Sequence, residues 1–347
     1  EVQTLVDQYY LRAQPDVAQR QYAAIRGVLA TLEDRYTFFV DPPVAQSESD
    51  ALAGTYGGIG VQVNRNEAGA FVLFPFEESP ATAAGIMSGD ILQAVNGMDI
   101  ELSTPPDQVD QLLRGEVKAG SGVTLTIVDA AGVSRDLFVE FAVINVPSVV
   151  WRVLLEDSDI GFVQIIRFTS RTPDELSTAL GELEAAHVSA LIVDLRNNSG
   201  GLLQESVDVA GQLLGNGQVV VYEKSNQSER ALSATNGGGG LKDIPLVVLV
   251  NQGTASASEL VAGAVQDHER GILIGQRTYG KGTVQQIFRL SDNSSVHITS
   301  AEWLTPNHRG LESVGLEPDL PMIPDANGRD VELGEAVRYL NEHYNLG

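Results

Sequence analysis

The feature that most constrains the fold is an alternation of apolar runs and helix-like segments in the second half of the chain. The runs "SALIVDL" (Ser189–Leu195) and "PLVVLV" (Pro245–Val250) are each followed by a segment with apolar residues at helical spacing. Short apolar runs of this kind indicate strands buried on both faces, and their alternation with helices is typical of a parallel sheet. We therefore predict an α/β layer over residues 147–347.

Two further regions precede this layer. Residues 1–50 carry apolar residues at helical spacing and predict a helical segment, in which the run "DPPV" (Asp41–Val44) ends the pattern. Residues 54–143 hold short alternating strands such as "IGVQVN" and "VTLTIVD", which Gly-rich turns separate. That pattern predicts a small β-rich domain.

The composition excludes several classes of function. The net charge of −24 repels phosphate and anionic lipid, so neither nucleic acid nor a membrane surface is an expected partner. No stretch approaches about 18 uninterrupted apolar residues, the length of a membrane span. The chain has no cysteine, which excludes a thiol nucleophile, disulfides and cysteine-bound zinc.

Three hydroxyl residues, Thr254, Ser256 and Ser258, follow an apolar run and precede a predicted helix. Ser256 and Glu259 have the spacing of a capping box, in which each side chain bonds a free N–H of the first helical turn. The same place also suits a nucleophile, because the Ala257 N–H and the helix dipole would favour a developing oxyanion. The residues alone leave both interpretations open.

A serine nucleophile needs a base, and none of the histidines is well placed in the sequence. His268 would lie roughly 18 Å along the helix from Ser256, and the others stand in no motif and are interpreted as surface or ordinary core residues. These others are His187, His297, His308 and His343.

Lys281 is the stronger candidate for the base. Two glycines flank it, and apolar runs on either side could bury it and lower its pKa from about 10.4. The alternative is a solvated lysine in a hairpin turn. Gly275, Gly280 and Lys281 also resemble a phosphate-binding loop, but Gly282 stands where that loop needs Ser or Thr, so no nucleotide site is expected.

A third element is the run "DLRNNSGG" (Asp194–Gly201), which follows the apolar run at Ser189–Leu195. A Gly-Gly turn before a helix can present free backbone N–H groups and so form half of an oxyanion hole. The alternative is an ordinary turn between a strand and a helix.

Together these motifs resemble one family. "DLRNNSGGLL", "VNQGTASASEL", "GAVQDHERG" and "TYGKGTVQ" are similar to the carboxyl-terminal processing peptidases, or tail-specific proteases, which are serine endopeptidases with a Ser-Lys dyad. Upstream, "GGIGVQV" and "SPATAAGIMSGDILQAVNGMDI" resemble the PDZ domain of these enzymes, and "AIRGVLATLEDRYTFFVDP" resembles the helical segment before it. The resemblance covers nearly the whole chain.

The resemblance implies a role for several residues of the core. Ser256 is the implied nucleophile, Lys281 the general base, and Gln285 the residue that supports Lys281. Because four residues of strand span about 13 Å, a contact between Lys281 and Gln285 needs a local turn, which Gly282 permits. Acyl transfer through an acyl-enzyme, without metal, nucleotide or other cofactor, is the implied mechanism.

The implied oxyanion donors are the N–H of Ala257 and that of Gly200 or Gly201, with no choice between the two glycines. Asp267 matches an acidic residue of the family and is expected to be structural. Ser199 stands where many members have proline, which we expect to loosen the turn slightly.

For the PDZ domain, the resemblance implies that the turn Tyr56–Gly60 offers N–H groups to the carboxylate of a substrate tail, and that the tail then adds as a strand. Residues near this turn would favour an apolar last residue of the substrate. Arg114 is a candidate for coupling tail binding to activity. The implied binding residues are Gly57, Gly58, Ile59, Gly60, Val61 and Arg114.

The expected architecture is a crotonase-like α/β protease core over 147–347, an inserted PDZ domain over 54–143 and an N-terminal helical segment over 1–50. Expected partners are proteins or peptides with free C-termini, membrane-associated substrates included, and a second copy bound through N-terminal helices that carry Tyr9, Tyr10 and Tyr22. We expect an extracytoplasmic protein, periplasmic or secreted, whose signal segment has been removed. The alternative function is an inactive peptide-binding protein on the same scaffold.

Overall fold

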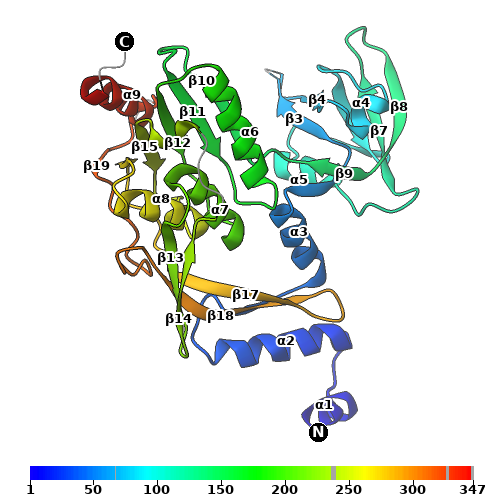
Figure 1. Cartoon of the computed structure of the whole chain (residues 1–347). Coiled ribbons are helices and arrows are strands. Elements are labelled where there is room, and N and C mark those ends of the chain that lie inside the picture. Colours follow the sequence, from blue (N-terminus) through cyan, green and yellow to red (C-terminus); the bar gives the residue numbers. More distant parts are fainter. Residues whose placement is uncertain (67, 236–239, 326–327, 345–347) are drawn as a thin grey trace. The chain divides into compact units, whose positions relative to one another are not determined.

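A computed structural model describes residues 1–66, 68–235, 240–325 and 328–344 (Figure 1). The chain divides into two compact units, one of Glu1–Ser49 with Ser148–Gly347 and the other of Asp50–Pro147. The N-terminal residues therefore share a unit with the predicted α/β layer.

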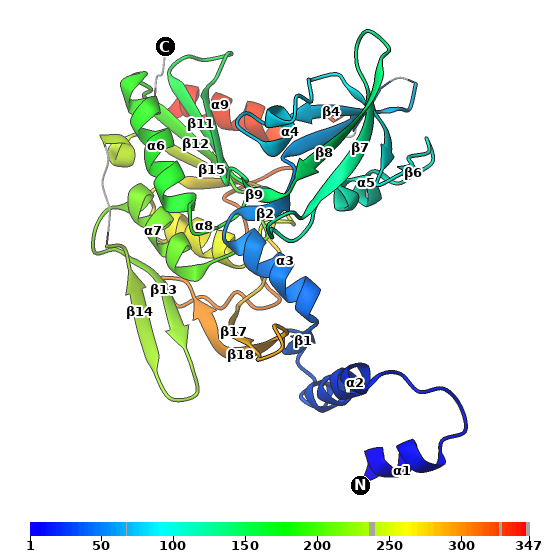
Figure 2. The same cartoon turned by 90° about the vertical axis from the view of Figure 1, so that its right-hand side faces the viewer.

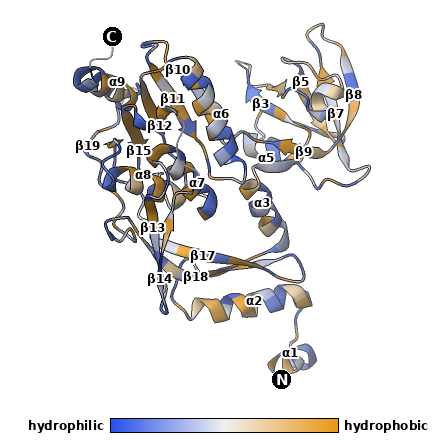
Figure 3. Ribbon diagram, in the orientation of Figure 1, coloured by the Kyte–Doolittle hydropathy of each residue, from blue (hydrophilic) through white to orange (hydrophobic). Residues whose placement is uncertain are grey.

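A mostly parallel sheet forms the centre of the larger unit. Its order is β10-β11-β12-β15-β16-β19, in which β10 alone runs antiparallel to its neighbour in the described residues. Every residue of β12 and β15 is buried, as the apolar runs predict, and these strands are mostly orange in Figure 3. The strands are Val149–Val153, Ile160–Ile165, Ala190–Asp194, Leu246–Val250, Ile272–Gly275 and Leu320–Pro321.

Helices cover both faces of this sheet (Figure 2). Since side chains alternate along a strand, Val193 packs in the core with α6, α7 and α8, whereas Ile192 packs in the core with α9. The helices are α6 (Thr172–Ala185), α7 (Leu203–Leu214), α8 (Ala257–Asp267) and α9 (Val331–Tyr344), with a short 3₁₀ helix at Gly240–Asp243. The prediction of an α/β layer with parallel strands is confirmed.

A second sheet lies in the same unit. Its order is β1-β18-β13-β14, and β17 pairs with β18 as an antiparallel hairpin. The segment after Lys281 is therefore a strand, which agrees with the exclusion of a phosphate-binding loop. The strands are β1 (Phe38–Val40), β13 (Val219–Lys224), β14 (Glu229–Ser233), β17 (Thr283–Arg289) and β18 (Ser295–Leu304).

Three helices occur in the N-terminal region: α1 (Val2–Tyr9), α2 (Val17–Ala30) and α3 (Pro42–Leu52). Neither α1 nor α2 buries a residue in the structure described. The prediction that "DPPV" ends the helical pattern is wrong in one respect, because Pro42 and Pro43 begin α3. Proline is tolerated in a first helical turn, where its missing N–H leaves no bond unmade.

The smaller unit is a β-rich domain around a core of fully buried side chains such as Leu73, Val95 and Leu125. Its main sheet has the order β3-β4-β5-β7-β8, with β6 paired to β5, while β2 pairs with β9. The helices are α4 (Pro80–Ala83) and α5 (Pro106–Leu112). The strands are β2 (Thr55–Gly58), β3 (Val61–Arg65), β4 (Phe71–Pro75), β5 (Ile91–Val95), β6 (Met98–Asp99), β7 (Gly122–Val128), β8 (Ser134–Glu140) and β9 (Ala142–Asn145).

Candidate active site

Ser256 stands at the junction between the turn that follows β15 and the first residue of α8. Its backbone has φ 56° and ψ −121°, a region that residues with a Cβ rarely occupy. Strain of this kind persists only where the surroundings hold it, and it often occurs at functional sites.

The three hydroxyls around Ser256 have different surroundings. Thr254 is fully buried and donates to the carbonyl of Leu195 at 2.8 Å. Ser258 is also fully buried and donates to the carbonyl of Asn198 at 2.9 Å. Ser256, between them, is only partly buried. Thr254 and Ser258 therefore tie this turn to the segment after β12, and Ser256 is the hydroxyl that a substrate could reach.

Glu259 connects the Ser256 turn with residues 278–281, the lysine loop, which carries Lys281. It accepts from the Ser256 N–H at 2.9 Å, which is the reciprocal half of the predicted capping box. The same buried carboxylate also accepts from the N–H groups of Gly280 and Lys281 at 2.8 and 2.9 Å, and from the Thr278 hydroxyl at 2.5 Å. Four donors offset the cost of burying this carboxylate, and they fix the two segments to each other.

Lys281 is partly buried, and this burial lowers the pKa of its ammonium group, although the charge of Glu312 acts in the opposite direction. Its Nζ donates to Gln285 Oε1 at 2.8 Å. The contact forms because Lys281 precedes β17 and the strand has an irregular register between Val284 and Gln285. In the described residues no hydrogen bond joins the Ser256 hydroxyl to Lys281 Nζ.

The glycine turn after β12 packs against Ser256. Gly200 has φ +100°, and a Cβ there would lie 2.9 Å from Ser256 Cβ. Gly201 has φ +148°, and a Cβ there would lie 2.0 Å from the carbonyl oxygen of Phe168, so this turn needs glycine at both positions. The Gly200 N–H already donates to Asn198 Oδ1 at 2.9 Å. Ser199 beside them is exposed.

Arg196 holds the same segment from the other side. Its guanidinium bonds Asp194 through Nε at 3.0 Å and reaches Asp330, immediately before α9, at 2.6 Å. These carboxylates raise the pKa of Arg196 above its ordinary value, despite burial that acts to lower it. Sequence reasoning recognised Glu259 only as a cap and missed Arg196, because the Lys281 segment and Asp330 lie far from them in the chain.

The histidines contact groups other than Ser256. His268 Nε2 bonds the carbonyl of Val219 at 2.7 Å, and His308 Nε2 lies 3.2 Å from Glu229. His297 is buried, stacks on Phe38 with ring centroids 4.6 Å apart, and has its pKa lowered by burial.

Asp267 has partners that lie outside the Ser256 turn. It forms an ion pair with Arg309 and accepts from the Asn307 N–H at 2.8 Å. These contacts hold the turn after β18 against the end of α8.

In the smaller unit, the predicted turn Tyr56–Gly60 is shorter than expected. Its first part is extended as β2, which pairs with β9, and Gly57 O accepts from the Gly115 N–H at 3.0 Å. The Ile59 N–H donates to the carbonyl of Leu113 at 3.3 Å. The chain then reverses at Gly60, which has φ +73°. The turn is therefore confined to the two residues before β3.

Strand β3 lies at the edge of its sheet, since it pairs with β4 alone in the residues described, and α5 packs beside it. Ile59 and Val61 at its start are buried in the domain core. Arg114 forms an ion pair with Asp110 at 2.5 Å, and its guanidinium lies 4.3 Å from the centroid of the Tyr56 ring.

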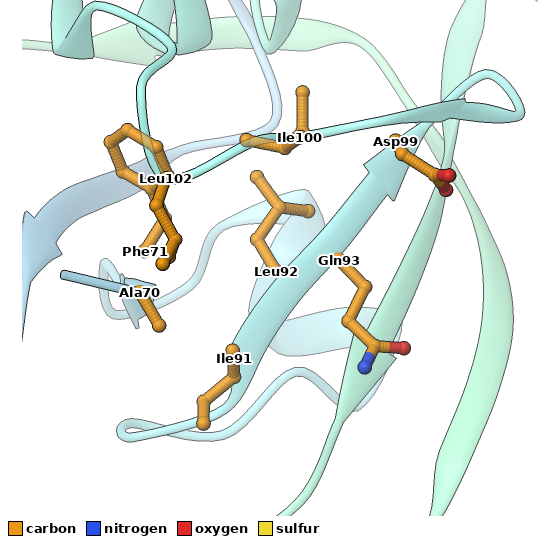
Figure 4. A pocket seen from close by; sticks show the side chains of 8 residues that line it. All are labelled: Ala70, Phe71, Ile91, Leu92, Gln93, Asp99, Ile100 and Leu102. Carbon is orange, nitrogen blue, oxygen red and sulfur yellow. The ribbon is translucent and has the colours of Figure 1, made fainter. Parts of the chain in front are cut away.

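A pocket of about 440 Å³ occurs elsewhere in this domain (Figure 4). None of the predicted tail-binding residues lines it. The lining residues come from β4, β5, β6 and their flanks: Ala70, Phe71, Ile91, Leu92, Gln93, Asp99, Ile100 and Leu102.

Comparison with known proteins agrees with this arrangement. Residues 159–322 match peptidase family S41, and residues 50–128 match the PDZ domain. A carboxy-terminal-processing protease of Bartonella bacilliformis is 34% identical over 297 residues, which cover 83% of this chain and 67% of that protein. This chain belongs to the carboxyl-terminal processing proteases of family S41. A chloroplastic C-terminal processing peptidase of Tetradesmus obliquus is 33% identical over 338 residues, covering 93% of this chain and 72% of the relative.

A solved structure of the photosystem II D1 C-terminal processing protease is similar across 94% of this chain and 89% of its own, with 31% identity and a TM-score of 0.55. The S41 member described here is thus a serine-type protease that has a PDZ domain. None of the helices in the described residues has the length and apolar character that crossing a bilayer requires.

Proposed function

We propose that this protease cleaves proteins near their C-terminus through an acyl-enzyme, with Ser256 as nucleophile and Lys281 as general base. The observation that carries the proposal is the buried Glu259 carboxylate, which bonds the N–H of Ser256 and that of Lys281. A single side chain thereby fixes the backbone on which both reacting groups stand.

Lys281 must be neutral to accept the Ser256 proton, and its lowered pKa favours that form. Gln285 Oε1 accepts an N–H from Nζ, so it leaves the amine lone pair free for the Ser256 proton. Catalytic hydrogen bonds are often absent before substrate binds, and we propose that the Ser256–Lys281 bond forms in the substrate complex. Ser256 then attacks the scissile carbonyl, and water later hydrolyses the acyl-enzyme.

The oxyanion is proposed to bind the Ala257 N–H at the start of α8 and a glycine N–H from the turn after β12. Of the two candidates, Gly201 is favoured, because the Gly200 N–H is already bonded to Asn198. Gly200 then has a steric role, since any side chain there would meet Ser256.

The PDZ domain is proposed to hold the substrate's C-terminal carboxylate at the reversal before β3, through the N–H groups of Gly60 and Val61. The tail would add as a strand to the free edge of β3, beside α5. Gly57, Gly58 and Ile59 support this reversal from β2 and through the bond to Leu113. Arg114, packed on Tyr56, is proposed to transmit tail binding to the protease core.

A covalent serine probe tests the catalytic proposal. We expect a fluorophosphonate to label the wild-type protein at Ser256, as mapped by peptide mass spectrometry, and not to label the Ser256→Ala variant. Labelling at another serine would overturn the assignment. A folded protein that binds tailed peptides but neither reacts with the probe nor cleaves them would support the alternative of an inactive binding protein.

We propose further that the chain is organised as a helical segment (1–50), a PDZ domain (54–143) and a protease core (147–347).

Exposed apolar side chains on α1 and α2, such as Val2, Tyr9 and Val28, are proposed to bind a second copy. Sedimentation at several concentrations tests this, and a monomer throughout would contradict it. An extracytoplasmic location is proposed from the similarity to carboxyl-terminal processing proteases, and the lack of cysteine is compatible with it.

A further inference from the structure

The N-terminal segment contributes a residue to the surroundings of Lys281. Tyr36 lies between α2 and β1, and its ring centroid is 5.3 Å from Lys281 Nζ. Its backbone carbonyl accepts a hydrogen bond from Gln285 Nε2, while Gln285 Oε1 accepts from Lys281 Nζ at 2.8 Å. Tyr36 therefore contacts both members of the Lys281–Gln285 pair, although it lies outside the residues 159–322 that match family S41.

The Tyr36 carbonyl decides the orientation of the Gln285 amide. An amide has one end that donates and one that accepts, whereas a carbonyl can only accept. Because the nitrogen of Gln285 is drawn to Tyr36, its oxygen faces Lys281. If the amide were reversed, Gln285 Oε1 would face the Tyr36 carbonyl, which also only accepts. Gln285 Nε2, a donor, would then face Lys281 Nζ. The carbonyl thus keeps the lone pair of a neutral Lys281 free.

The Tyr36 ring acts on Lys281 in two opposing ways. Its face attracts an ammonium group, which favours the charged form by about 0.5–1 kcal/mol at exposed sites. Its bulk keeps water away, which favours the neutral form. Burial lowers the pKa of Lys281, and the Tyr36 ring, 5.3 Å from Nζ, is one of the groups that bury the ammonium. The Tyr36 hydroxyl is buried without a hydrogen-bond partner in the described residues, so it contributes no bond.

Tyr36 is itself held firmly. Its N–H donates to Asp34 Oδ1 at 2.9 Å, and the Thr37 hydroxyl donates to Asp34 Oδ2 at 2.6 Å. The Thr299 N–H of β18 donates to the Thr37 hydroxyl at 3.0 Å. The Arg35 guanidinium also lies 4.5 Å from the Tyr36 ring centroid. The turn that presents Tyr36 is therefore fastened to the strand that pairs with β17.

We propose that Tyr36 is a positioning residue for the general base. Its carbonyl orients Gln285, and its ring keeps Lys281 out of water, so that the N-terminal segment completes the active site. This inference rests on the proposed function in taking Lys281 as the base.

Three variants test the role of the ring. Tyr36→Ala removes it, Tyr36→Leu keeps apolar bulk, and Tyr36→Phe removes only the unbonded hydroxyl. Two measurements are made on each: the pH profile of kcat/KM, and the pKa of Lys281 itself. The second uses competitive acetylation with acetic anhydride, followed by mass spectrometry, in a Ser256→Ala background, and so needs no turnover.

We expect Tyr36→Phe and Tyr36→Leu to keep the wild-type profile. In Tyr36→Ala, the pKa of Lys281 should rise by about one unit, which leaves about tenfold less neutral amine near pH 7. Its kcat/KM should fall about tenfold at that pH and recover at alkaline pH. If Tyr36→Ala does not fold, as judged by circular dichroism, Tyr36→Gln takes its place with the same expectation, because a polar side chain admits water.

A loss of activity at every pH with an unchanged Lys281 pKa would show a merely structural role and overturn the proposal, as would unchanged activity and pKa. The two proposals fail separately. If Lys281→Ala retained turnover, the dyad would be wrong, yet the acetylation experiment would still decide whether Tyr36 controls the Lys281 pKa.

Discussion

The turn around Ser256 and the edge of β3 organise their polar groups in opposite ways. At the turn, side chains bond backbone groups in closed sets, with Glu259 alone accepting four hydrogen bonds. At β3, the groups proposed to bind a tail are backbone N–H and C=O groups of an unpaired strand edge. The first arrangement depends on side-chain identity, whereas the second depends on backbone course. Substitutions should therefore damage the two sites very unequally.

The largest effect is expected at Lys281. Lys281→Ala should reduce kcat/KM by at least about a thousandfold, because the Glu259 carboxylate at the Ser256 turn is already occupied by four donors and no histidine bonds Ser256 in the part of the chain that the structure describes. Lys281→Arg should fail as well, since arginine does not lose its proton. Hydrolysis of a tailed substrate measures the effect, with thermal unfolding as the control for folding. Wild-type turnover in Lys281→Ala would show that the dyad is wrong.

Glu259→Gln should have the second-largest effect on kcat/KM. A neutral amide would set its NH₂ group against N–H donors, which leaves buried groups unpaired and costs about 3 kcal/mol of stability. We expect kcat/KM to fall about a hundredfold, because the loop of Lys281 is no longer fixed to Ser256. Glu156→Gln, at an exposed residue between β10 and β11, is the matched control. Activity and urea unfolding equal to wild type would mean that Glu259 does not join the two segments.

The tail site should show a smaller effect. Amidating a substrate's C-terminus removes its charge and should lower kcat/KM about tenfold, the scale of one charge-assisted hydrogen bond. Substitution of Gly58 by valine should mimic this loss on tailed substrates, since a Cβ there would lie 2.8 Å from the Tyr56 ring and 3.0 Å from the Leu113 carbonyl. The test compares kcat/KM for one peptide in its acid and amide forms. Equal values would contradict the proposal that the PDZ domain recognises the C-terminal carboxylate.

The smallest effect is expected in the dependence of kcat/KM on pH. Only neutral Lys281 is a base, so kcat/KM should rise with pH through a pKa below the ordinary 10.5 and then level off. Between the folded and unfolded pKa values the unfolded chain binds more protons, so the contribution of Lys281 to stability should also rise with pH. Lys281→Met should lose this dependence. A profile governed by a group near pH 6.5 that disappears in a His268 variant would point to histidine instead.

Local patterns predicted the central sheet well, since runs such as Leu246–Val250 are buried on both faces and need no distant information. They predicted Ser256 and Lys281 through the family resemblance. They could not predict the β1–β18 pairing or the bond from Gln285 to Tyr36, whose partners are 249 residues apart in the chain. Glu259 was recognised only as a cap, because its other three donors depend on how the lysine loop folds back.

The backbone of Ser256 has one consequence for the choice of an inactive variant. Its φ of 56° and ψ of −121° are the angles that glycine adopts without strain at the second residue of a type II′ turn. Alanine at this position would remove the hydroxyl and retain the strain, whereas glycine would remove both. The nucleophile thus occupies a position where the protein trades stability for reactivity. For capturing uncleaved substrates, we therefore expect Ser256→Gly to be a more stable inactive variant than Ser256→Ala.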